Sequence, residues 1–134
     1  MNKMQTVPVL ELDPLVELFR LLADPTRLRI LVLLYHRELC VCEISDILNI
    51  SQPKISRHIA KLRTTGLVNL SRHAQWVFYQ LNRDENEQES VNNLLVGILQ
   101  QILDEVHKGN YQEIGADIAR LHEKERTNGL CKRD

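Results

Sequence analysis

Two cysteines separated by a single residue, Cys40 and Cys42, are the side chains of this sequence best suited to chemistry. Their thiolates are soft ligands, which favour thiophilic ions over magnesium or calcium. Cys42 lies nine residues before Ser51, where residues 51–58 (SQPKISRH) have the pattern of a basic helix. An ion held by both thiols could move that helix. The sequence therefore predicts that ion binding and the binding of a partner by the basic helix are coupled.

The charge distribution indicates what that contact is. Residues 47–83 contain six basic side chains and no acidic one, whereas from residue 84 to the end eleven acids face six bases. The net charge of −1 conceals this asymmetry. A locally basic stretch in an otherwise acidic chain favours a polyanion bound by one face, and an ordinary solvated charged surface is the alternative.

Length and composition restrict the fold. A chain of 134 residues corresponds to about one domain, and 43% hydrophobic but only 4% aromatic residues favour packed helices. The longest apolar run, residues 30–35, is too short to cross a bilayer, and the N-terminal residues lack a signal-peptide pattern. We therefore expect a cytoplasmic protein without membrane contact, in which three cysteines serve metal binding or reactivity rather than disulfides.

Helical spacing of apolar residues predicts three helices in the N-terminal half, over residues 12–22, 25–35 and 44–48. The second has Asp24 as its capping residue, with proline at its first position. Residues 38–42 interrupt the pattern and are expected to be non-helical.

A fourth helix is predicted to begin after Ser51 as the N-cap and to end at Gly66. Its apolar residues Ile55, Ile59 and Leu62 form one stripe, which leaves the opposite side of the helix free for a partner.

Period-two alternation predicts two strands, over residues 67–71 and 76–81, around a polar turn at 73–75. Helical spacing returns over residues 87–107 as a wide apolar stripe. A last amphipathic helix is predicted by a stripe that starts at Tyr111 and consists of Tyr111, Ile114, Ile118 and Leu121.

This order of elements is that of a winged helix-turn-helix, mainly α with a small β-hairpin. We predict a DNA-binding and dimerisation domain over residues 1–110, followed by a C-terminal amphipathic helix and flexible tail over 111–134. The long helix has more apolar surface than so small a domain buries, which predicts a homodimer through the first and last long helices. The alternative is that this surface folds back into its own core.

The predicted reading surface combines the exposed face of the fourth helix with the hairpin tip. Gln52 and Arg57 are suited to base edges, and the cations Lys54, Lys61 and Arg63 to phosphates. The residues at the hairpin tip, Arg72 and His73, are expected to reach a minor groove or flanking phosphates. His58 points toward the core and is predicted to pack there. The predicted DNA-binding residues are Ser51, Gln52, Lys54, Ser56, Arg57, Lys61, Arg63, Arg72 and His73.

Three segments, ELCVCEI at 38–44, SQPKISRH at 51–58 and QWVFYQL at 75–81, resemble the ArsR/SmtB family of metal-responsive repressors, most of all its arsenic-sensing members. The resemblance extends over residues 12–83. It implies a dimeric repressor, not an enzyme, which leaves double-stranded operator DNA when an ion binds Cys40 and Cys42. As(III) or Sb(III) is the implied inducer; Cd(II), Pb(II) or Zn(II), and thiol redox sensing, are alternatives.

One position departs from the arsenic-sensing members, because Ser45 stands where they commonly carry a third cysteine. Cys131 is the candidate third metal ligand, from the tail of either subunit, and a small-molecule thiol is the alternative. Residues i and i+2 of a helix lie about 200° apart, so Cys40 and Cys42 can face one ion only if the backbone there is non-helical. We expect ion binding to hold or force that backbone and to displace the recognition helix.

Overall fold

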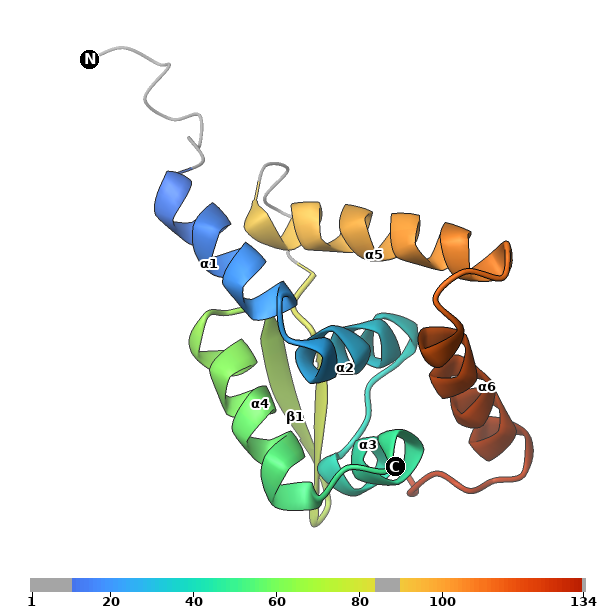
Figure 1. The fold of residues 1–134 in the computed structure, drawn as a ribbon. Coiled ribbons are helices and arrows are strands. Elements are labelled where there is room, and N and C mark those ends of the chain that lie inside the picture. Colours follow the sequence, from blue (N-terminus) through green and yellow to red (C-terminus); the bar gives the residue numbers. More distant parts are fainter. Residues whose placement is uncertain (1–10, 84–89, 134) are drawn as a thin grey trace.

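The computed structural model describes residues 11–83 and 90–133 and is mainly helical, with one antiparallel hairpin (Figure 1). The winged helix-turn-helix order predicted from the sequence is confirmed. Its elements are α1 (Leu12–Leu22), α2 (Pro25–His36), α3 (Val41–Leu48), α4 (Gln52–Thr64), β1 (Val68–His73), β2 (Trp76–Leu81), α5 (Val91–His107) and α6 (Gln112–Arg126). The predicted start of α5 at residue 87 lies outside the described residues.

Helix α2 lies at the centre of the fold, with α1 and α5 on one side, α6 beside it, and α3 and α4 below (Figure 1). Its five consecutive residues Ile30–Leu34 are all buried, because neighbours surround the helix on every side. The predicted cap is confirmed: the Asp24 side chain accepts a hydrogen bond from the Arg27 N–H at 3.0 Å. This central position makes α2 the common support of the other elements.

Helices α3 and α4 form the helix-turn-helix. Asn49 ends α3 in the left-handed conformation (φ 57°), and the Ile50 N–H bonds the Ser45 carbonyl, which closes the turn. Ser51 is the N-cap of α4 as predicted, although its hydroxyl makes no capping bond. The predicted stripe of α4 is also confirmed, since all three of its apolar residues are buried.

The hairpin of β1 and β2 is the wing, paired from Val68 opposite Leu81 to His73 opposite Trp76. Its tight turn places Ala74 at φ 56°, a conformation that non-glycine residues adopt rarely. The wing is also joined to the segment before α3, because Leu39 and Tyr79 exchange two backbone hydrogen bonds of 3.0 and 2.8 Å.

Helix α6 is fixed to the fold by an ionic network around Asp117, whose side chain is only 1% exposed. Arg29 of α2 donates to both oxygens of this carboxylate, at 2.8 and 2.9 Å. Arg120 donates to Asp117 and, through Nε, to the Ile47 carbonyl at the end of α3. The prediction that Tyr111 belongs to the apolar stripe is wrong: this residue precedes the helix at φ 54° and is 57% exposed.

Helix α5 buries one side in the hydrophobic core of the same chain, through Leu95 and Leu99 among others. Its neighbour α1 nonetheless exposes large apolar side chains, with Leu12 68% and Phe19 53% exposed, and Leu94 of α5 is 41% exposed. Part of the apolar surface of these helices is therefore buried in the core of the same chain, as one alternative predicts, and part of it remains exposed. No helix in residues 11–83 and 90–133 is long and apolar enough to span a membrane.

Replacing Asp117 by alanine is expected to lower the free energy of unfolding by about 3 kcal/mol, because it leaves the partly buried guanidinium of Arg29 without its partner. Urea denaturation followed by circular dichroism measures this. The control Asp104→Ala removes an exposed carboxylate of α5 and is expected to change stability by less than about 0.5 kcal/mol. Equal effects of the two variants would contradict the assignment of Asp117 as the anchor of α6.

Candidate functional site

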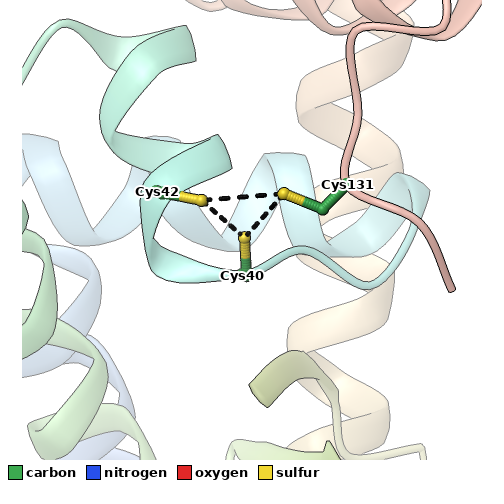
Figure 2. Close-up of side chains that lie close together, drawn as sticks. All are labelled: Cys40, Cys42 and Cys131. Atoms are coloured by element: carbon green, nitrogen blue, oxygen red, sulfur yellow. Dashed lines mark hydrogen bonds between the residues drawn. The ribbon is translucent and has the colours of Figure 1, made fainter. Parts of the chain in front are cut away.

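Three thiols meet at the N-terminal end of α3 (Figure 2). Cys40 Sγ lies 3.0 Å from Cys42 Sγ and 3.9 Å from Cys131 Sγ, and the third sulfur–sulfur distance is 3.8 Å. Cys40 is buried and the other two are half-buried. The structure thus brings together all three cysteines that the sequence proposed as metal ligands. The donor set is purely sulfur, which suits a thiophilic ion.

The backbone explains how the first two thiols converge. Residues 38–42 were predicted to be non-helical, but α3 already begins at Val41, so that prediction is wrong at its C-terminal end. Cys40 is the N-cap, with extended torsions (φ −91°, ψ 169°), and Cys42 lies in the first turn. A single extended residue is enough to turn both sulfurs to one side, so the helix need not unwind further.

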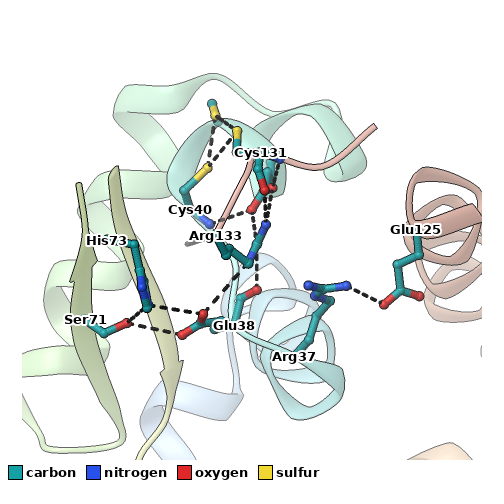
Figure 3. Close-up of polar contacts among 10 residues, drawn as sticks. Arg37, Glu38, Cys40, Ser71, His73, Glu125, Cys131 and Arg133 are labelled. Carbon is teal, nitrogen blue, oxygen red and sulfur yellow. Dashed lines mark hydrogen bonds and ion pairs between the residues drawn. The ribbon is translucent and has the colours of Figure 1, made fainter. Parts of the chain in front are cut away.

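The carboxylate of Glu43, only 4% exposed, holds this end of the helix. It accepts the Cys40 N–H at 2.9 Å and the Cys131 N–H at 2.6 Å, and it forms an ion pair with Arg133. Figure 3 shows the Arg133 side chain between the cysteines and Glu38, whose carbonyl accepts from it at 2.9 Å. In the segment predicted as a C-terminal amphipathic helix and flexible tail (111–134), Cys131 and Arg133 are therefore joined to the start of α3 by these contacts.

Protonation of the thiols follows from their surroundings. Burial first, and then the contact with Cys42, raise the pKa of Cys40, and the same two causes raise the pKa of Cys131. Burial alone would raise the pKa of Glu43 as well, but Arg133 and the two cysteine N–H groups lower it overall. At neutral pH Cys40 and Cys131 are therefore protonated thiols beside an ionised, paired carboxylate, and an ion that binds these two sulfurs must displace their protons.

Ser45, at the position where the family resemblance would place a third cysteine, belongs to another part of the structure. Its hydroxyl donates to the Ile50 carbonyl in the turn between α3 and α4. The position is used to close the turn, and the third sulfur comes from Cys131, 89 residues after Cys42.

The exposed side of α4 carries the predicted reading residues. All seven on this helix are exposed, and Arg72 of the wing is exposed too. Within the part of the chain that the structure describes, none of their basic side chains is engaged in an ion pair. The residues of α4 concerned, with its N-cap, are Ser51, Gln52, Lys54, Ser56, Arg57, Lys61 and Arg63. The surface is therefore open and basic, with its charge available to a polyanion.

Two histidines near this surface face inward. His73 was predicted at the tip of the wing, but its ring lies 3.5 Å from the Glu38 carboxylate and packs edge-on against Phe78. His58 is half-buried beside Arg27, as predicted. Burial and the neighbouring cations lower the pKa of His58, so its ring is neutral at neutral pH and adds no charge to the surface.

A polar cleft of about 340 Å³ joins the two regions. Its lining includes Cys42 of α3, Asn49 and Ile50 of the turn, and Ser51 and Gln52 at the start of α4. The sulfur cluster and the N-terminus of α4 are thus neighbours across one short turn.

Sequence reasoning missed Glu43 and Arg133. A signal for Glu43 was present, since a capping box places a glutamate three residues after the N-cap, and here that N-cap is Cys40. No local pattern identifies Arg133, because its partner Glu43 lies 90 positions earlier.

Comparison with known proteins supports the sequence resemblance. A family profile described as "Bacterial regulatory protein, arsR family" matches residues 24–69. The arsenic resistance transcriptional regulator ArsR1 of Pseudomonas putida is 51% identical over 65 residues, or 48% of this chain and 51% of that protein. The arsenical resistance operon repressor of Escherichia coli is 50% identical over 68 residues, or 50% and 58%. The chain thus spans just over half the length of these curated relatives.

The solved structure of HlyU from Vibrio cholerae superposes with a TM-score of 0.56 at 34% identity, over 76% of this chain and 97% of that one. A match at this identity over nearly the whole neighbour extends the agreement beyond the family profile. These relatives are transcriptional regulators rather than enzymes. The chain belongs to the ArsR family of bacterial regulatory proteins.

Proposed function

We propose that the protein is a metalloid-responsive transcriptional repressor. It binds operator DNA as a homodimer and is released when As(III) or Sb(III) binds Cys40, Cys42 and Cys131. The observation that carries this proposal is the convergence of three sulfurs within 4.8 Å at the start of α3. The likeness to two arsenic-resistance regulators supports the same choice of ion.

The number of donors and their protonation favour a trivalent metalloid over two of the alternatives, Zn(II) and thiol redox sensing. As(III) prefers three thiolates, and the described residues offer three sulfurs at this point. Zn(II) in structural sites takes four ligands. Thiol redox sensing is less favoured, because reactivity needs a thiolate and the pKa values of Cys40 and Cys131 are raised.

The reading surface is proposed to be the exposed side of α4. Gln52 and Arg57 lie where an amide and a guanidinium could each make paired contacts with base edges in the major groove. Lys54, Lys61 and Arg63 add charge that attracts phosphates without reading the sequence. Arg72 on the wing extends the same positive surface to flanking DNA.

Coupling between the three thiols and the exposed side of α4 is proposed to pass through α3. When bound, the ion supplies bonds to three thiolates, so the sulfurs must lose their protons and take fixed positions. Any adjustment at Cys42 is transmitted along a helix of eight residues to the turn that sets α4. Release requires roughly 3–5 kcal/mol of differential binding between the two arrangements, which thiolate bonds can supply.

The dimer is proposed to form through the apolar surface of α1 and α5. Leu12, Phe19 and Leu94 are exposed there although they are large and apolar, and such patches mark interaction surfaces. A two-fold dimer places two copies of α4 against two half-sites, so a small change in each subunit disrupts both contacts together.

Replacing Cys40 or Cys42 by serine is expected to leave operator affinity unchanged, because neither lies on the α4 surface, but to abolish release by arsenite. A gel-shift titration with arsenite on labelled operator DNA measures both properties, and circular dichroism checks the fold. Release of either variant at the arsenite concentration that releases the wild type would exclude the pair as the sensor.

Replacing Gln52 by alanine is expected to cost about 1–3 kcal/mol of specific binding and to relax sequence preference. Lys61→Ala should weaken binding to all DNA sequences alike and reduce the salt dependence of binding by about one phosphate contact. Fluorescence anisotropy on operator and scrambled DNA across a salt series separates these effects. Lys108→Ala, an exposed lysine after α5, is the control; a loss there as large as for Lys61→Ala would argue against α4 as the reader.

Replacing Phe19 by aspartate is expected to convert the dimer to monomers and to lower operator affinity, because it puts a charge in the apolar surface of α1. Sedimentation velocity measures the oligomeric state. The comparison variant Arg20→Ala changes a side chain of the same helix that is 73% exposed and polar. A fully dimeric Phe19→Asp protein would show that the dimer forms elsewhere.

A further inference from the structure

The Glu43 carboxylate is the point where the tail meets the thiol site. Its Oε1 accepts the Cys40 N–H at 2.9 Å and the Arg133 Nη2 at 2.6 Å. Its Oε2 accepts the Cys131 N–H at 2.6 Å and the Arg133 Nη1 at 3.1 Å. Each oxygen thus takes one cysteine backbone N–H and one nitrogen of the guanidinium fork.

We propose that Glu43 and Arg133 are positioning residues of the sensor, which hold Cys131 of the same chain in place as the third thiol. The inference rests on the proposed function for the identity of the ion. It goes beyond that function because it assigns the subunit from which Cys131 comes and the two residues that hold it in place. It favours the tail of the same subunit over the partner's tail or a small-molecule thiol.

The two-oxygen arrangement explains why an arginine stands at position 133. A guanidinium presents parallel N–H groups that match both oxygens of a carboxylate, which a lysine ammonium cannot do. The pair is well shielded, with the Arg133 and Glu43 side chains only 13% and 3% exposed. In such surroundings the charge-assisted bonds are stronger than at an open surface.

Arg133 also makes contacts that direct the tail toward the wing. Its guanidinium lies 4.2 Å from the centre of the Phe78 ring in β2, and Nη2 bonds the Glu38 carbonyl. Nη1 additionally bonds the carbonyl of Cys131 itself, at 2.6 Å. One side chain therefore fixes the conformation of the tail and its docking on α3, which places the Cys131 sulfur beside the other two.

The first test uses the full-length protein without any ion. Iodoacetamide labelling with peptide mass spectrometry gives the alkylation rate of Cys131 separately from the other thiols. Arg133→Gln is expected to raise that rate ~10-fold or more, since charge-assisted hydrogen bonds that dock the tail are lost. The matched control is Lys132→Gln, which removes a neighbouring exposed charge and should leave the rate unchanged.

The second test adds arsenite and follows which thiols it protects. Arsenite should protect all three thiols from alkylation in the wild type and in Lys132→Gln. In Arg133→Gln it should protect only Cys40 and Cys42. The arsenite concentration for half-protection of these two should rise ~10- to 100-fold in Arg133→Gln, as for outer-shell groups of metal sites. In a Cys131→Ser background, Arg133→Gln should add nothing, because it acts through that thiol.

An unchanged Cys131 alkylation rate in Arg133→Gln would overturn the inference, and so would an effect that persists without Cys131. Glu43→Gln is the second variant: it keeps an acceptor oxygen but loses the charge pair, and should move Cys131 reactivity in the same direction. Operator release is not used as a readout. A wild type that arsenite fails to release from DNA would therefore refute the proposed function while the ion-free labelling still decides this inference.

Discussion

At the buried start of α3, a single carboxylate accepts hydrogen bonds from two backbone N–H groups that lie about 90 residues apart in the sequence and from a guanidinium. Without Glu43 the Cys40 N–H would lack its capping partner and the tail would lose its anchor. In the arrangement that we propose, the positions of the sulfurs depend on Glu43, which contacts the backbone of Cys40 and Cys131 and not their thiols. It joins local helix capping to long-range packing at the point where the three thiols meet.

The C-terminal helix supports the other end of α3 in a comparable way. Asp117 fixes α6 to α2 through Arg29, and Arg120 carries the contact on to the Ile47 carbonyl. Helix α3 is thus held at its start by the tail and at its end by α6, with α4 beside it. Contacts at both ends favour α3 behaving as one rigid element, which fits the proposed transmission of a small displacement from the sulfurs to α4.

Local signals were sufficient to predict most of the fold. The cap at Asp24, the stripe of Ile55 and Ile59, and the alternation in the wing each depend on neighbours within a few residues, and these predictions agree with the structure. The prediction that Tyr111 belongs to the apolar stripe failed, because helical periodicity does not reveal that a residue precedes the first turn. The docking of Cys131 and Arg133 was beyond reach, since it depends on contacts across about 90 residues that periodicity and capping rules do not encode.

The paired hydrogen bonds between Leu39 and Tyr79 have a consequence for how the wing behaves in a crowded cell. A two-stranded hairpin is marginally stable alone and offers unpaired backbone groups along both borders. Here the segment before α3 occupies part of the border of β2, so at that position a strand from another molecule finds no free donor or acceptor. The same short bridge that joins the wing to the domain therefore also shortens the border of β2 that is open to edge-to-edge pairing.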